Sequence, residues 1–309
     1  MTLFGSDFLL LLVGINICLA YAVYPTAMVG RINVAPVAYM AIGAYASAYF
    51  TNHQQSILLG AAVGIAISLL IALLLSLVVG HLRGHFFLAA SLGVALIVQQ
   101  IAFSLKSVTN GYLGVTTTAD IVEPWHVAVL VVICVMAAIS LRYSTMDRIW
   151  RAVGDDDQIA SALGIDPARS VLVASLCSAV IGTLCGVFYG HIIAFFDPNS
   201  FGLPLILGLL SAVVLGGVSN WYGPILGAFI ITVLPELLRD FGLWRHAAIG
   251  FVLIGAVIFL PKGLSDTEGL RSIAKQGLLL FGLRREKTEQ NDDGERATSV
   301  AKAVDRAAR

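Results

Sequence analysis

Long apolar runs alternate with short polar or glycine-rich breaks along most of the chain. A helix of about 20 apolar residues crosses the hydrocarbon core of a bilayer, and most of the runs approach that length. The pattern predicts an all-α fold, a polytopic transmembrane helical bundle of about eight to ten spans. The predicted spans are residues 8–29, 35–50, 56–80, 86–105, 125–141, 170–195, 203–216, 222–238 and 246–260.

The stretch 203–238 within this pattern is broken by glycine and proline. Gly216 and Gly217 end one run, and Gly223 and Pro224 begin the next. The two runs are either two short spans or a pair of broken, re-entrant helices, which a membrane tolerates only where protein or a cavity covers the exposed backbone. Both interpretations are compatible with the sequence.

Glycine recurs at every fourth position in the run 170–195. Small residues at this spacing lie on one face of a helix and let neighbouring helices approach closely in lipid. We expect this face to pack against another helix, with a pore-lining role as the alternative. Its residues are Gly182, Gly186 and Gly190.

Charged residues are scarce in the body of the chain and concentrated at its end. They make up 12% of the sequence, about half of the fraction in soluble domains, and ten of the 19 Lys and Arg residues lie at or beyond Lys262. Because Lys and Arg favour the cytoplasmic side, the charges fit nine alternating spans with an outer N-terminus and a cytoplasmic C-terminus. We therefore expect a multi-pass protein of a bacterial inner membrane, surrounded by the lipid bilayer.

This distribution divides the chain in two. Residues 1–264 are expected to form a transmembrane domain with an inner loop at 142–169. Residues 265–309 are expected to form a cytoplasmic tail. The first part of the tail has apolar residues at helical spacing, which is typical of a helix on the membrane surface, and the rest is charged and small, which is typical of disorder.

The sequence offers few groups for chemistry inside the membrane. No Asp, Glu, Lys or Arg falls within the first six predicted spans, whereas ion-coupled carriers generally need ionisable groups there. The phosphate-cradling pattern G-x-x-x-x-G-K-[ST] does not occur, and no cysteine has the neighbours of a metal site. We therefore expect a transport subunit with no enzymatic activity, cofactor, metal or nucleic-acid partner, which must take any energy from another polypeptide.

The inner loop contains the pattern of a short, capped helix. Asp155 is the expected N-cap, with Gln158 three residues later, and Gly164 is the expected end. An apolar stripe on this helix is covered either by the membrane domain itself or by the groove of a partner, because so short a helix is marginal alone in water. The residues expected to make the helix and its stripe are Asp155, Asp157, Ile159, Ala160, Leu163 and Gly164.

This loop resembles the ATPase-coupling segment of branched-chain amino acid ABC permeases, which typically read R-A-[IV]-R-E-x-E-I-A-A-x-A-L-G-I. The main departure is Gly154, which stands where the family has Arg. The segment 30–45, GRINVAPVAYMAIGAY, is similar to the family's G-Q-[LIV]-S-[LF]-G-x-[AG]-x-[FLM]-x-A-I-G-A-Y, with departures at Arg31, Asn33, Ala35 and Pro36. Further blocks in family order are 84–93, 108–115, 197–202, 214–228 and 259–264.

The resemblance implies a membrane-spanning permease subunit, of the longer of the family's two types, in an ATP-driven importer. The implied partners are a homologous permease in a heterodimer, two ATP-binding cassette ATPase subunits that hydrolyse the ATP, and an extracytoplasmic solute-binding protein. The expected solutes are small and amino-acid-like, branched-chain amino acids first. The alternative is a stand-alone secondary transporter or channel for small polar solutes such as urea or amides. Separately, the departures at Asn33 and Pro36 suggest a hypothesis for the solute, a shift from branched-chain amino acids towards amides, urea or other small polar solutes.

The resemblance also implies a translocation path lined by small and polar residues near the broken segments. For the two adjacent glutamines of the span 86–105, hydrogen bonding between helices is the alternative role, because an amide that faces lipid is costly. The residues expected along the path are Asn33, Ser91, Gln99, Gln100, Asn110 and Ser219.

Overall fold

The computed structural model describes residues 3–82, 84–117, 123–238, 250 and 263–264. All of them belong to the first of the chain's two units, Met1–Ser265. The predicted span 246–260, apart from residue 250, and the predicted tail 265–309 lie outside the described residues.

The described part of the chain is almost entirely helical, which confirms the all-α polytopic bundle. Six stretches in it are long and apolar enough to cross a membrane: Phe8–Met28, Ile57–Val79, His85–Ser104, Trp125–Tyr143, Pro167–Ile193 and Pro198–Gly216. The elements are α1 (Leu3–Met28), α2 (Pro36–Asn52), α3 (Ile57–Val79), α4 (His85–Ser104), α5 (Lys106–Thr109), η1 (Gly111–Leu113), β1 (Val115–Thr116), α6 (Pro124–Tyr143), α7 (Thr145–Asp155), α8 (Asp157–Ala162), α9 (Pro167–Ile193), β2 (Phe195–Phe196), η3 (Pro198–Phe201), α10 (Leu203–Gly216) and α11 (Gly223–Leu237).

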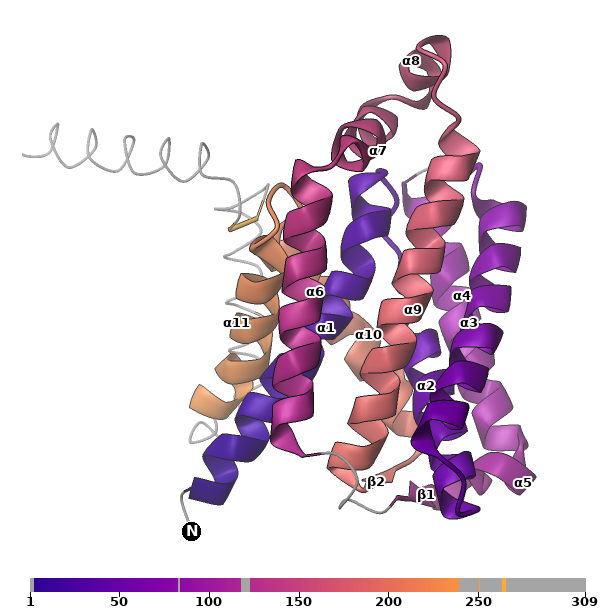
Figure 1. Ribbon diagram of the computed structural model, residues 1–309, viewed down its shortest axis with the longest axis vertical. Helices are drawn as coiled ribbons and strands as arrows, with labels where there is room; N and C mark the ends of the chain where they lie inside the picture. Colours follow the sequence, from indigo (N-terminus) through magenta and orange to yellow (C-terminus); the bar gives the residue numbers. More distant parts are fainter. Residues whose placement is uncertain (1–2, 83, 118–122, 239–249, 251–262, 265–309) are drawn as a thin grey trace, which may run out of the picture. The chain divides into compact units, whose positions relative to one another are not determined.

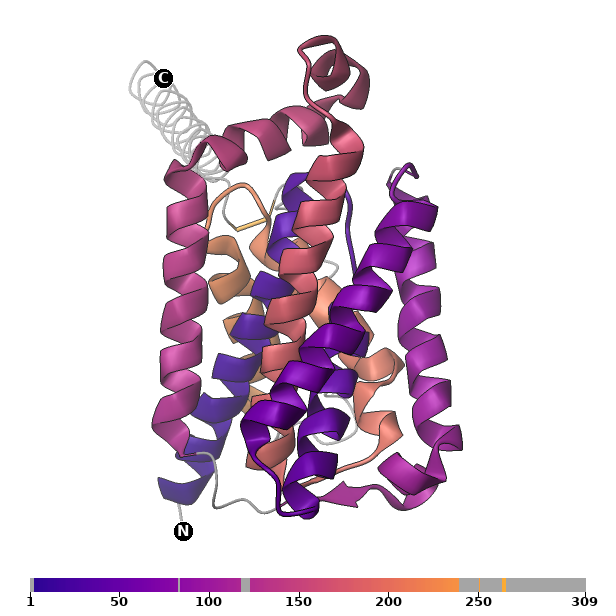
Figure 2. The ribbon, with the colours of Figure 1, turned by 45° about the vertical axis from the view of Figure 1, so that its right-hand side comes forward.

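The long helices run side by side between two ends of the bundle (Figures 1 and 2). The helices α7 and α8 lie at one end, which we call the α8 end. The strands β1 and β2 and the short helix α5 lie at the other, which we call the β end. The two strands are antiparallel, with Val115 opposite Phe196 and Thr116 opposite Phe195. They join the segment after α4 to the segment after α9 at this end.

The helix α2 begins inside the bundle rather than at its end. A segment without helix, residues 29–35, returns from the α8 end, and the helix then starts at Pro36. A Cβ on Gly182, near the middle of α9, would lie 3.1 Å from the Pro36 carbonyl oxygen. Most of the segment is buried. Proline suits this position because the first turn of a helix has no partner for its N–H group.

The glycines of α9 bring its backbone against that of α2. A methyl group on Gly186 would overlap the Met40 carbonyl oxygen, and one on Gly190 would lie 3.4 Å from the Ala44 Cα. Gly60 of α3 approaches α2 from another side, since its Cβ would lie 2.6 Å from the Ser47 Cα. The contacts of Gly186 and Gly60 leave no room for a methyl group, whereas the contact of Gly190 with Ala44 is ordinary van der Waals contact. Small residues permit such close approach of helices in lipid.

The interrupted stretch 203–238 forms two short helices joined by a turn. The helix α10 ends at Gly216 and α11 begins at Gly223. Methyl groups on Gly216 and Gly227 would overlap backbone oxygen atoms of the opposite helix, at Gly223 and Ala212. A glycine that breaks the apolar pattern, Gly216, therefore also lets the backbones of the two helices come into close contact.

Candidate functional site

Two short helices stand at the α8 end between α6 and α9 (Figure 2). The helix α7 begins after Ser144, whose Oγ accepts a hydrogen bond from the Met146 N–H at 3.2 Å. Its apolar residues Trp150 and Val153 are buried against the bundle. The polar residues Arg148 and Asp155 on its other side are exposed. This amphipathic helix was not expected from the sequence.

The second helix, α8, begins one residue later than predicted. Asp155 is not the N-cap but the last residue of α7, because the apolar face of α7 extends that helix to this point. Asp156 is the N-cap: its backbone is extended, and its Oδ1 accepts hydrogen bonds from the Gln158 N–H at 2.7 Å and the Ile159 N–H at 3.3 Å. Asp157 is then the first helical residue, where a carboxylate complements the helix dipole.

The predicted apolar stripe of α8 is divided between two environments. Ala160 is fully buried, whereas Ile159 is 63% exposed and Leu163 is 72% exposed. Gly164 follows with a φ of +82°, and a Cβ added to it would meet no atom within 4 Å. A left-handed glycine here ends the helix. The bundle covers only the alanine, so two large apolar side chains project from the α8 end.

An ion-pair cluster fastens α7 to its neighbours. Asp147 is 5% exposed. It accepts hydrogen bonds from Arg142 of α6 at 3.1 Å and from Arg151 of α7 at 3.0 Å. Arg151 also donates to the Ser219 carbonyl oxygen at 3.1 Å. The cluster therefore ties together α6, α7 and the turn between α10 and α11.

Two of the expected path residues, Asn33 and Ser91, each hydrogen-bond to the segment that leads into α2. Ser91 of α4 accepts a hydrogen bond from the Val34 N–H at 3.1 Å and donates one to the Leu88 carbonyl at 2.9 Å. Asn33 accepts one from the Ala35 N–H through its Oδ1 at 2.9 Å. Both side chains are fully buried. The Asn33 Nδ2 has no hydrogen-bond partner within the described part of the chain.

The other four expected path residues lie apart from this pair. Gln99 donates to the Pro198 carbonyl at 3.0 Å, a bond between α4 and η3. Gln100 is exposed on α4, and Asn110 is an exposed left-handed residue with a φ of 54° between α5 and η1. Ser219 lies at the α8 end with Arg151. The structure therefore does not bring the six residues into one lining.

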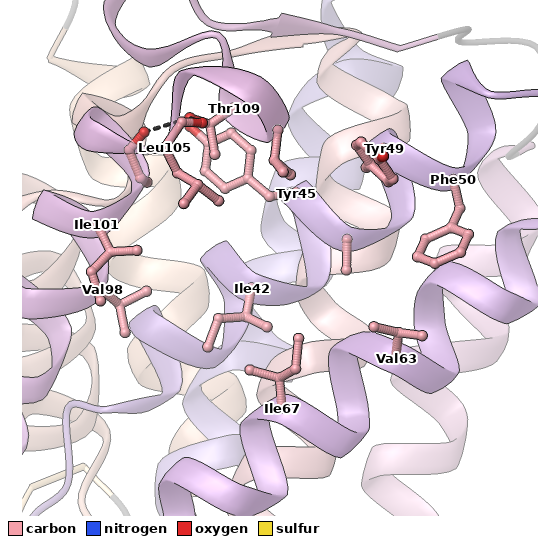
Figure 3. Close-up of a pocket in the computed structure, with 13 residues that line it drawn as sticks. Ile42, Tyr45, Tyr49, Phe50, Val63, Ile67, Val98, Ile101, Leu105 and Thr109 are labelled. Carbon is pink, nitrogen blue, oxygen red and sulfur yellow. Dashed lines mark hydrogen bonds between the residues drawn. The ribbon is translucent and has the colours of Figure 1, made fainter.

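A cavity of about 340 Å³ opens between α2, α3, α4 and α5 (Figure 3). Ile42 and Tyr45 of α2 and Ile67 of α3 line it, facing Val98 and Ile101 of α4. Its lining is almost wholly apolar, and the Thr109 hydroxyl at its edge donates to the Leu105 carbonyl at 2.9 Å. None of the six expected path residues lines it. No sequence signal marks it, because its residues look like any apolar helix face.

Comparison with known proteins is consistent with this architecture. A family model described as branched-chain amino acid transport system / permease component matches residues 6–261. The permease protein LivM of Escherichia coli K12, from a high-affinity branched-chain amino acid transport system, is 31% identical over 139 residues, which are 45% of this chain and 33% of LivM.

Relatives with other names match comparable stretches. The autoinducer 2 import system permease protein LsrC of Photorhabdus luminescens is 31% identical over 147 residues, which are 45% of this chain and 44% of LsrC. The branched-chain permease protein LivH of Salmonella typhimurium is 29% identical over 161 residues, 50% of this chain and 49% of LivH. The matches thus span a third to a half of the length of these curated relatives. No solved structure matches the chain.

Proposed function

Because the chain belongs to the family of branched-chain amino acid transport system permease components, we propose that it is the membrane-spanning subunit of an ATP-driven importer. It works with a homologous permease, two ATP-binding cassette ATPase subunits and an extracytoplasmic binding protein. The observation that carries the proposal is α8, a capped helix that projects Ile159 and Leu163 from one end of the bundle. Exposed apolar side chains on a short, fixed helix are suited to a partner's groove.

The distribution of charge supports a cytoplasmic position for this helix. Arg31, Arg142, Arg148, Arg151 and Arg169 belong to the α8 end, whereas Lys106 is the only Lys or Arg residue at the β end within the described residues. Lys and Arg are enriched on the cytoplasmic side of membrane proteins. The α8 end then faces the ATPase subunits, and the β end faces the binding protein.

The solute is proposed to be small and amino-acid-like, with branched-chain amino acids first. Relatives named for branched-chain amino acid transport and for autoinducer 2 import both match this chain, so the family includes more than one solute class. The buried Asn33 Nδ2, without a partner among the described residues, favours a second candidate class of amides or urea. Uptake assays with leucine, urea and a simple amide decide between them, and uptake of leucine alone would reject the second class.

The test of the coupling role uses the complex reconstituted in liposomes. Ile159→Arg and Leu163→Arg place a charge where an apolar contact is expected, and a buried Leu or Ile is worth about 1.5–3 kcal/mol. We expect each variant to reduce ATPase co-purification and ATP-dependent uptake by about tenfold or more. Ala160 is unsuitable for this test, because it is fully buried and a large residue there would disturb the fold.

A matched control comes from the opposite end of the bundle. Leu113, at the β end, is 82% exposed. Leu113→Arg adds the same charge at an equally exposed leucine, and we expect it to leave ATPase binding unchanged. Normal ATPase co-purification in both α8 variants, or an equal loss of ATPase co-purification in the Leu113 variant, would contradict the assigned role of α8.

A further inference from the structure

A buried arginine lies between α8 and the segment that leads into α2. Arg31 is 3% exposed. Its Nη2 lies 3.1 Å from the Asp157 Oδ2. Its Nε donates to the Leu82 carbonyl at 3.2 Å, and its Nη1 donates to the Val29 carbonyl at 3.1 Å. A buried charge is expensive unless it is paired and hydrogen-bonded, and this guanidinium satisfies both conditions.

The three acceptors belong to three different parts of the bundle. Val29 follows the end of α1, Leu82 follows the end of α3, and Asp157 is the first residue of α8. The guanidinium therefore holds the start of α8 against the ends of two spans. Because its planar fork directs several N–H groups at fixed angles, it fixes the orientation of these helix ends as well as their separation.

The same arginine is also close in sequence to the interior end of α2. Only four residues separate Arg31 from Pro36, and this stretch contains Asn33 and Val34, whose contacts with Ala35 and Ser91 are described above. From Pro36 onward α2 packs along the glycine face of α9. A displacement of Arg31 thus reaches the start of α2 through a short, buried and hydrogen-bonded stretch.

A second contact runs parallel to the ion pair. Gly30 and Gly154 meet backbone to backbone, since a Cβ on Gly30 would lie 2.9 Å from the Gly154 carbonyl oxygen. Gly30 also has a φ of +74°, which other residues rarely adopt. The segment before α2 is therefore in contact both with the end of α7 and with the start of α8.

We propose that Arg31 is a positioning residue that transmits the movement of α8 to α2. When the ATPase moves α8, the Arg31–Asp157 pair pulls or pushes the segment 29–35, and the interior end of α2 moves beside Asn33 and Ser91. This inference rests on the proposed function, because it assigns the path by which ATPase movement reaches the membrane interior. The exposed side chains of α8 bind the partner, and Arg31 carries the movement inward.

The experiment measures substrate transported per ATP hydrolysed in the reconstituted complex. Arg31→Gln and Asp157→Asn remove the ion pair with little change in side-chain volume. We expect both variants to retain ATPase binding and ATP hydrolysis within about twofold, while transport per ATP falls by about tenfold or more. The double variant should be no worse than Arg31→Gln alone, because that variant has already lost the ion pair with Asp157. Arg31→Lys should recover only part of the ratio.

The matched control is an exposed pair of the same type at the same end. Arg169 lies 3.1 Å from Asp166, and their side chains are 85% and 49% exposed. Arg169→Gln removes this pair and should leave transport per ATP unchanged. A purely structural role for Arg31 would lower the amount of folded complex without changing the ratio. If the Arg31→Gln complex does not assemble, transport per ATP in the Asp157→Asn complex tests the inference instead.

The outcomes separate this inference from the proposed function. A wild-type complex that binds no ATPase, or shows no ATP-dependent uptake, would overturn the proposed function and this inference with it. A coupled wild-type complex whose ratio is unchanged in Arg31→Gln and Asp157→Asn would overturn only the inference. An equal fall of transport per ATP in the Arg169→Gln control would also overturn the inference, because the loss of any positive charge at the α8 end would then have the same effect.

Discussion

The packing of α9 on α2 makes a quantitative prediction for Gly186→Ala. The added methyl group would overlap the Met40 carbonyl oxygen, whereas ordinary van der Waals contact begins near 3.4 Å. The obstacle is a backbone atom inside a helix, so it cannot rotate away as a side chain can. The two helices must therefore move apart along the face that also contains Gly182 and Gly190.

The cost of this separation follows from the range of dispersion forces. A gap of about 0.5–1 Å already loses a quarter to a half of the contact energy across an interface. Overpacking a close-packed interior costs about 1–3 kcal/mol, and a clash with backbone belongs at the upper end, about 3 kcal/mol. At about 2.1 cal/mol/K of unfolding entropy per residue, a chain of 309 residues then melts at a temperature lower by about 4–5 °C.

Thermal unfolding of the purified protein in detergent measures this effect, and Gly93→Ala is the matched control. Gly93 lies in α4, and a Cβ there would meet no atom within 4 Å. Alanine is favoured over glycine in a helix by about 1 kcal/mol, so the control should melt at the same temperature or slightly higher. Equal melting temperatures for the two alanine variants would refute the close approach of α9 and α2.

Two further predictions concern the caps of short helices. Asp156→Ala should destabilise α8 by about 1 kcal/mol, and hydrogen exchange in the first turn of α8 should become faster. Asp155→Ala should leave this exchange unchanged. Faster exchange in the Asp155 variant than in the Asp156 variant would reject Asp156 as the N-cap. At the β end, burial raises the pKa of Asp197, but hydrogen bonds from Asn199 and Ser200 outweigh it and hold that pKa below its usual value. The native state then binds fewer protons than the unfolded state, so this contribution to stability is present above about pH 4 and is lost as the pH falls through the lowered pKa. Asp197→Asn should flatten the acid side of the melting-temperature profile, and an unchanged profile would contradict the assignment.

The spans were predictable because each depends on a local property, the length of an apolar run. The helix α2 illustrates this, since the run predicted at 35–50 became a helix that begins at Pro36. The helix α7 was missed because charged residues interrupt its apolar ones and leave no long apolar run, although Ser144 as a cap and the spacing of Met146, Trp150 and Val153 were available as signals. Treating 142–169 as one loop also misplaced the N-cap at Asp155.

Other features depend on contacts that the sequence does not encode locally. The strands β1 and β2 are two residues long and about 80 residues apart, so they have no periodicity to detect. The six residues expected along one path all have small or amide polar side chains, but they lie in different parts of the bundle. Ser91 bonds to Val34, next to Asn33, because the chain returns into the bundle before Pro36. Ser219 instead lies at the α8 end beside Arg151.

Arg31 and Gly154 show how two separate departures from a family pattern become one structural feature. The pattern has Arg where this chain has Gly154, but a Cβ at this position would lie 2.5 Å from the Met28 carbonyl oxygen and 3.2 Å from the Gly30 nitrogen. A long side chain therefore cannot start there in this packing. Arg31 lies one residue from that backbone contact and pairs with Asp157. A buried positive charge therefore lies at the junction between α8 and the interior of the bundle, and it is attached to the segment that enters α2.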